Sequence, residues 1–297
     1  INFFNEFIQI IFNRKSFLNI MKIIDTYSEI KKYFSKGKFR IDTWEDYADR
    51  ISPEFKEKIK RDSQSYNFQT EILPVMNHLI ENQAKLDLAH SSFIKLTNNL
   101  SEKVEKQMKI NLEMKIVFCL GLCNGAGWAT TLDGEDAVLL GVEKIVELSW
   151  CNKNEMAGLI YHEIGHIWHK TMRKDKFEPK TQKNDALWRI YSEGVAMHVE
   201  QLIYGDMNFF HQDKNGWRGW CEQRKTRLFS EYLKRVKNGE KVDQFFGDWC
   251  KFEGVSDIGY FLGAEMIKYL SKDREINEVA NLEMNDIEKA IENLTKK

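Results

Sequence analysis

Apolar residues recur at intervals of three and four along most of the chain, the spacing that places side chains on one face of a helix. A helix is predicted over residues 21–34, before Gly37. Asp42 and Ser52 predict two further helix starts, and Pro53 suits the first position of the second. The same spacing predicts helices over residues 71–83, 85–107, 184–204, 218–237, 244–252 and 258–270, followed by a charged terminal helix.

The pattern changes between residues 115 and 148. Residues 115–120 form a short apolar run, and three glycines follow it within seven positions. Two apolar stretches, 128–132 and 137–142, flank Asp133-Gly134 and predict a hairpin. Residues 137–141 are the candidate edge strand, to which an extended peptide could add by main-chain hydrogen bonds. An ordinary structural hairpin explains these residues equally well.

These elements predict an α+β, mostly helical fold. A helical N-terminal region would occupy residues 1–110. A second region, 111–297, would hold a small sheet at 115–148, two active-site helices within 154–204 and a helical C-terminal part. This order puts the sheet directly before the motif-bearing helices.

Charge and composition narrow the classes of partner. The chain has 44 Lys and Arg against 45 Asp and Glu, so bulk charge favours neither nucleic acid nor anionic membranes. We find no apolar stretch long enough for a membrane span. Residues 1–12 are apolar but interrupted by polar side chains, and no basic segment precedes them, which makes a poor signal peptide. Because the first methionine is Met21, residues 1–20 are expected to be an upstream extension or the remnant of a removed segment.

The cysteines bear on the cellular compartment that we expect for the protein. There are five, an odd number, and they show no paired zinc-ribbon spacing. They are typical of reduced thiols, and we expect a cytoplasmic protein.

Residues 158–170 read GLIYHEIGHIWHK and contain the chain's one HExxH pattern. On a helix, His162 and His166 lie on the same face one turn apart, where two imidazoles can bind one Zn²⁺. Glu163 then lies beside the open position of the metal and can take a proton from the attacking water. A core helix whose two histidines are satisfied by hydrogen bonds is the alternative.

Glu193 is the candidate third ligand, since His₂Glu is a standard set for catalytic zinc. It follows His166 by 27 residues, which is enough for one helix to end and a second to return. Gly165 and Gly194 would let these helices approach closely. An exposed carboxylate on a helix face is the alternative. Apolar neighbours favour burial instead, and a buried glutamate requires a cation; these neighbours are Ile190, Val195 and Ala196.

Tyr-His-Glu-Ile-Gly-His at residues 161–166, followed by Ser-Glu-Gly-Val-Ala at 192–196, resembles the gluzincin clan of zinc peptidases. Residues 258–265 also resemble the Gly-Tyr-x-x-Gly element of a bacterial group of predicted zinc-dependent proteases without assigned substrates. The resemblance covers roughly residues 115–270. It implies zinc held by His162, His166 and Glu193, with Glu163 as general base and Tyr260 as first choice to stabilise the oxyanion. His211 and Tyr204 are the other candidates for that donor.

The chain departs from the clan at two points. It lacks the Gly-x-Met-Glu-Asn motif that binds the substrate amine in the clan's aminopeptidases. It has Met197 at the position where an Asp orients a metal-binding histidine in thermolysin-like enzymes. Glu200, Asp185 and Asp206 remain as candidates for that orienting group. His169 lies about 10 Å along the helix from His162, too far to share its ion, which excludes a metzincin arrangement.

The leading hypothesis is a zinc-dependent hydrolase that cleaves peptides or unfolded protein. A zinc hydrolase of a small amide or an epoxide is the second hypothesis. The third is a metal-binding or regulatory protein without catalysis, which the intact Glu163 disfavours. Zinc is inferred from the ligand types, since His₂Glu also accepts neighbouring transition metals. The aromatic residues at 209, 210, 217 and 220 are read first as core around the site and second as a hydrophobic substrate pocket.

Overall fold

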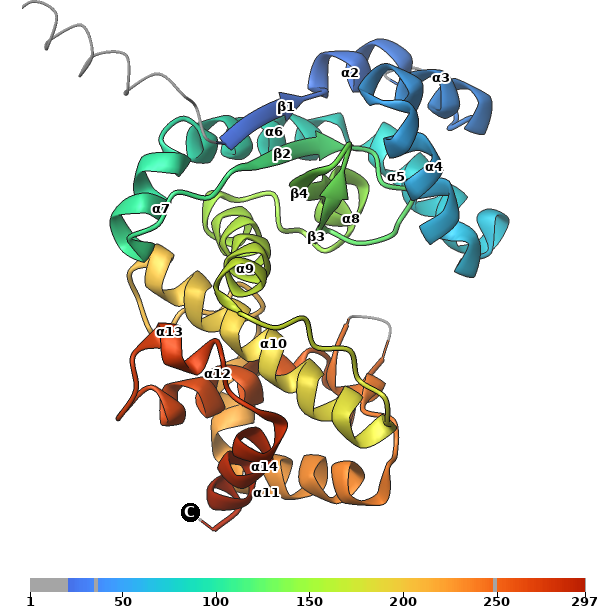
Figure 1. Ribbon diagram of the computed structural model, residues 1–297. Coiled ribbons are helices and arrows are strands. Elements are labelled where there is room, and N and C mark those ends of the chain that lie inside the picture. The colour runs from blue at the N-terminus through green and yellow to red at the C-terminus, as the bar shows by residue number, and fades with distance from the viewer. Residues whose placement is uncertain (1–20, 35–36, 248–249, 297) are drawn as a thin grey trace, which may run out of the picture.

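The computed structural model describes residues 21–34, 37–247 and 250–296. These residues form one small sheet surrounded by helices, so the predicted α+β, mostly helical fold is confirmed (Figure 1). The signal-peptide prediction concerned residues that lie outside the described ranges. Among the described residues, no helix is long and apolar enough to cross a membrane.

The sheet is built from four strands in the described part of the chain. They are β1 (Met21–Asp25), β2 (Met114–Cys119), β3 (Gly127–Leu132) and β4 (Glu135–Gly141), in the spatial order β1-β2-β4-β3. β1, β2 and β4 run parallel, with Ile116 opposite both Ile23 and Val138. β3 returns antiparallel to β4 through Asp133 and Gly134, which both have positive φ, so the predicted hairpin is confirmed.

Two predictions about this sheet were wrong. Residues 21–25 are strand rather than helix, because they pair with β2, some ninety residues later, and such a partner is invisible to local periodicity. Residues 137–141 are not an edge strand, because β4 lies between β2 and β3. β3 is the edge on that side. The parallel pairing of β1 with β2 also carries the sheet across the expected boundary at residue 110.

Helices of the N-terminal half lie beside the sheet (Figure 1). Ser52 caps the second of the two predicted starts by accepting the amide hydrogen of Phe55. The helix predicted over 85–107 is two helices that part at Asn98 and Asn99. The elements are α2 (Tyr27–Phe34), α3 (Ile41–Ile51), α4 (Pro53–Asp62), a 3₁₀ turn (Ser63–Ser65), a π-helical turn (Phe68–Ile72), α5 (Leu73–Glu81), α6 (Gln83–Thr97) and α7 (Leu100–Met108).

The C-terminal half is helical, as expected, except at one place. The helix predicted over 244–252 is wrong: a 3₁₀ turn, Asp243–Phe245, buries Phe245 against Tyr232, and Gly247 then takes a positive φ. The helices are α8 (Val142–Glu147), α9 (Lys153–Met172), α10 (Gln182–Tyr204), α11 (Trp217–Asn238), α12 (Ile258–Leu270), α13 (Ile276–Val279) and α14 (Met284–Leu294).

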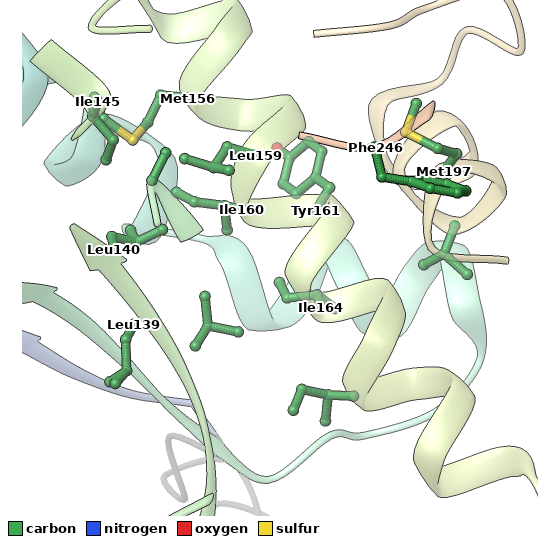
Figure 2. Packing of buried hydrophobic residues seen from close by; sticks show 14 of the residues in the cluster. Leu139, Leu140, Ile145, Met156, Leu159, Ile160, Tyr161, Ile164, Met197 and Phe246 are labelled. Carbon is green, nitrogen blue, oxygen red and sulfur yellow. The ribbon is translucent and has the colours of Figure 1, made fainter. Parts of the chain in front are cut away.

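The motif helix α9 is buried at the centre of the molecule, between the sheet and α10 (Figure 1). Ile160 and Ile164 belong to the same buried cluster as Leu139 and Leu140 of β4 (Figure 2). α10 packs in turn against α12. A helix buried on several sides holds its polar side chains in fixed positions, and this rigidity is what a metal centre requires.

Candidate metal centre and cleft

Three side chains from α9 and α10 converge. The imidazole rings of His162 and His166 lie 4.8 Å apart between centroids, as expected one helical turn apart. Glu193 Oε2 lies 3.1 Å from Nε2 of His162 and 3.3 Å from Nε2 of His166. The potential ligand atoms of these three residues all lie within 4.8 Å of one another. The structure therefore brings together the three residues that the sequence singled out.

A glycine on α9 permits this convergence. A Cβ at position 165 would lie 2.7 Å from the Cα of Ala196 and 2.8 Å from its carbonyl oxygen, so the backbones of α9 and α10 touch here. Gly194 was expected to let the same two helices approach, but it faces a third helix instead. A Cβ there would lie 2.5 Å from the carbonyl oxygen of Gly263, which belongs to α12. The two glycines thus let α10 pack closely against a different helix on each side.

We expect Gly165→Ala to destabilise the protein by about 1–3 kcal/mol, because the added methyl group meets backbone that cannot rotate away. The displacement of α9 should also weaken metal binding. Gly219→Ala on α11 is the matched control. A Cβ there meets nothing within 4 Å, so alanine should stabilise the helix by about 0.5–1 kcal/mol. Urea unfolding of both variants measures the difference, and equal stability of the two would contradict the close approach.

The electrostatics of the centre favour positive charge. Burial alone would lower the pKa of His162, but hydrogen bonds to Glu193 and Glu200, with the charge of Glu163, raise it to about 10. Burial would raise the pKa of Glu193, yet the charges of His166 and His162 bring it well below its usual range. A His₂Glu donor set, with His162 buried and the other two half-buried, surrounded by further carboxylates, fits a divalent transition metal.

Of the three candidate orienting groups, Glu200 is the one that lies beside His162. It is fully buried, and its Oε2 lies 3.5 Å from Nδ1 of His162. Of the other two candidates, Asp206 accepts the amide hydrogen of Asn208, and Asp185 lies in the first turn of α10, two turns before Glu193. Glu200 is therefore the remaining candidate to replace the aspartate that is missing at Met197. It also lies 3.0 Å from Nδ1 of His211.

Glu163 lies at a cleft next to the centre. Its side chain is 6% exposed and lines a cavity of about 530 Å³ together with His162 and Tyr260. A Cβ at Gly127, the first residue of the edge strand β3, would lie 3.0 Å from Cγ of Glu163. The side chain of Glu163 thus packs against the strand that ends the sheet and lines the same cavity as His162.

The opposite wall of the cleft was missed by sequence reasoning. It comes from the π-helical turn and α5 in the N-terminal half, and from the loop before β3. These residues carry no chemical motif, and only the fold brings them to the site. No signal in the sequence would have found them; they are Tyr66, Thr70, Glu71, Pro74 and Val75 on one side and residues 123–126 on the other.

The three residues predicted as candidates to stabilise the oxyanion have different positions relative to the cleft. The ring of Tyr260 lies 5.5 Å from that of His162 and lines the cleft. Burial, with the charges of Glu193, Asp257 and Glu163, raises the pKa of Tyr260 far above its usual value, so its phenol keeps its proton. His211 also lines the cleft. Tyr204 instead stacks on Phe209 at 3.6 Å between ring centroids and is not among the lining residues.

Two other predictions concern residues near the centre. His169 is buried, with its Nε2 3.2 Å from the carbonyl oxygen of Ala280, and belongs to the packing of α9. The aromatic residues at 209, 210, 217 and 220 were predicted first as core and second as a substrate pocket, and the structure favours the core. Phe210 and Trp217 are buried against Phe261 and do not line the cleft.

No protein-family model, curated protein or solved structure matches this chain.

Proposed function

We propose that this protein is a metal-dependent peptidase, with Zn²⁺ as the expected ion. The observation that carries the proposal is the placement of Glu163, which faces the cleft beside the converged His162, His166 and Glu193. A buried structural helix would have no use for a carboxylate turned towards an open cavity next to two histidines. A site that activates water requires a base at this position.

Each residue of the site has a separate proposed role. His162, His166 and Glu193 would hold the ion. When bound, such an ion lowers the pKa of water towards about 7 and polarises a carbonyl group. Glu163 accepts a proton from the attacking water and passes it to the leaving amine. The Tyr260 hydroxyl donates a hydrogen bond to the oxygen that becomes negative at the scissile carbonyl.

A peptide is the substrate that this cleft suits best. In the described part of the chain β3 pairs with β4 alone, and its first residue, Gly127, lines the cleft beside Glu163. An edge strand offers unpaired main-chain groups that hold an extended peptide in register without regard to its side chains. We therefore transfer the prediction of peptide binding from β4 to β3. The physical reason is unchanged, since an edge strand offers unpaired main-chain groups.

The test is hydrolysis of a mixed peptide library by zinc-reconstituted protein, followed by mass spectrometry with and without a chelator. We expect new termini to appear with zinc and to disappear with the chelator. Chelator-resistant cleavage would contradict the metal requirement. Stoichiometric zinc without any cleavage would favour the binding or regulatory alternative. Turnover of small amides or epoxides but no peptide would favour the second hydrolase hypothesis.

Tyr260→Phe should lower kcat by about 10²–10³ while metal content stays unchanged, because one oxyanion donor is lost and no ligand is touched. Tyr204→Phe removes the hydroxyl of a tyrosine that does not line the cleft and is the matched control. Steady-state kinetics and metal analysis of both variants decide the assignment. An unchanged kcat in Tyr260→Phe would remove this residue from the mechanism.

A further inference from the structure

Tyr260, the proposed donor, packs against another ring besides that of His162. The ring of Phe246 lies 5.7 Å from that of Tyr260 between centroids, at 80°, so the two meet edge to face. Phe246 is buried and directly follows the 3₁₀ turn Asp243–Phe245, in the segment where the sequence predicted a helix. A residue that carries no motif thus contacts the tyrosine to which the proposed mechanism gives a role.

A glycine next to Tyr260 makes room for this contact. A Cβ at Gly259 would lie 2.2 Å from Cε1 and 2.4 Å from Cζ of Phe246. The ring of Phe246 therefore lies directly on the backbone of α12, one residue before Tyr260. Because backbone in a packed helix cannot rotate away as a side chain can, the ring and the helix constrain each other.

An ion pair holds the segment of Phe246 against α10. Cζ of Arg189 lies 4.7 Å from the centre of the Phe246 ring, so the guanidinium stacks over that ring. Nη1 of Arg189 also donates to Oδ1 of Asp243 at 2.7 Å. One side chain of α10 thus contacts both ends of the segment 243–246. Arg189 stands four residues before Glu193, one turn away on the same face of α10.

The helix that carries Tyr260 is fixed against α10 close to the metal centre. A Cβ at Gly194, the neighbour of Glu193, would lie 2.5 Å from the carbonyl oxygen of Gly263. Gly263 follows Tyr260 by three residues, so the backbone contact lies one turn from the tyrosine and prevents α12 from sliding along α10. The freedom that remains to Tyr260 is in its side-chain torsions, which contact with Phe246 restricts.

We propose that Phe246 is a positioning residue for Tyr260. With its ring held by Arg189 and by the backbone at Gly259, Phe246 fixes the phenol of Tyr260 beside His162, where the hydroxyl can donate to the scissile carbonyl. A donor that is in place before the substrate arrives stabilises the oxyanion without reorganising during the reaction. This inference rests on the proposed peptidase function.

Phe246→Leu tests this role, and Phe245→Leu is the matched control. Both variants remove one buried ring from the same segment, but Phe245 packs against Tyr232 of α11. We expect both to lower the stability of the zinc-loaded protein in urea. Phe246→Leu alone should lower kcat, by about 10²-fold as for a misplaced catalytic group, with zinc content and KM unchanged. Metal analysis, urea unfolding and steady-state kinetics on the same preparations measure these effects.

A double-variant cycle distinguishes positioning from a general loss of structure. In the Tyr260→Phe background the hydroxyl is already absent, so Phe246→Leu should cause no further loss of kcat. A structural defect would instead lower kcat by the same factor in both backgrounds. Arg189→Gln repeats the test from a side chain that is 29% exposed, in case Phe246→Leu fails to fold. It should lower kcat by about 10-fold in wild type and leave kcat of Tyr260→Phe unchanged.

Three results would overturn the proposal. Unchanged kcat in Phe246→Leu, or an equal loss in Phe245→Leu, would make Phe246 an ordinary core residue. Loss of zinc in Phe246→Leu would make it a support of the metal centre. Full additivity with Tyr260→Phe would show that the two residues act independently. In all three cases an active wild type leaves the peptidase function intact, whereas zinc-loaded wild type that cleaves no peptide would overturn both.

Discussion

Glu193→Ala is expected to abolish stoichiometric zinc binding and, with it, hydrolysis. Loss of even an outer partner of a ligand costs about 10–100-fold in metal affinity, so loss of a ligand should cost more than about 100-fold. The carboxylate is the one anionic group of the set, and its Oε2 faces both imidazoles, at 3.1 and 3.3 Å. Metal analysis of purified wild type, Glu193→Ala and His166→Ala should give about one zinc per chain in wild type and none in either variant.

Ser192→Ala is the matched control for this measurement. Ser192 neighbours Glu193 on α10, and its hydroxyl donates to the carbonyl of Arg189 within the helix. Zinc should remain in this variant. Zinc retained by Glu193→Ala would show that the third ligand lies elsewhere and would end the gluzincin hypothesis. Absence of metal from wild type, even after reconstitution, would restore the alternative of a structural helix with two buried histidines.

Glu163→Gln is expected to keep zinc and lose activity. Glutamine preserves the shape of the side chain against Gly127 but cannot accept the proton. General bases typically contribute about 10²–10⁴-fold, so kcat should fall by at least that range while KM changes little. Kinetics and metal content measured on the same preparation separate this effect from damage to the metal centre.

Glu155→Gln provides the comparison on the same helix. Glu155 lies in the first turn of α9 and does not line the cleft, so activity should stay near wild type. Activity that survives in Glu163→Gln would disprove the general-base assignment. Zinc lost from Glu163→Gln would instead mean that this carboxylate belongs to the ligand set.

The sequence by itself determined which side chains the motif helix brings to the centre. His162, Glu163 and His166 lie on one helix, where spacing along the chain fixes relative position, so a local pattern was sufficient. Helical periodicity also gave Ile258–Leu270 with its observed bounds, and Asp133-Gly134 gave the hairpin. Glu193 could be selected because apolar neighbours on its own helix indicated burial; its side chain is half-buried, with 20% exposed.

Only the tertiary structure decided which groups surround that centre. Glu200 could not be separated from Asp185 and Asp206, because the choice depends on how α10 lies against α9. The strand at Met21–Asp25 and the exchange of edge from β4 to β3 depend on partners distant in the chain. The far wall of the cleft, from Tyr66 to Val75, carries no motif at all. Within one helix, the spacing of residues along the chain fixes which side chains lie together. Contacts between distant segments depend instead on the packing of the whole chain, which a local sequence pattern does not predict.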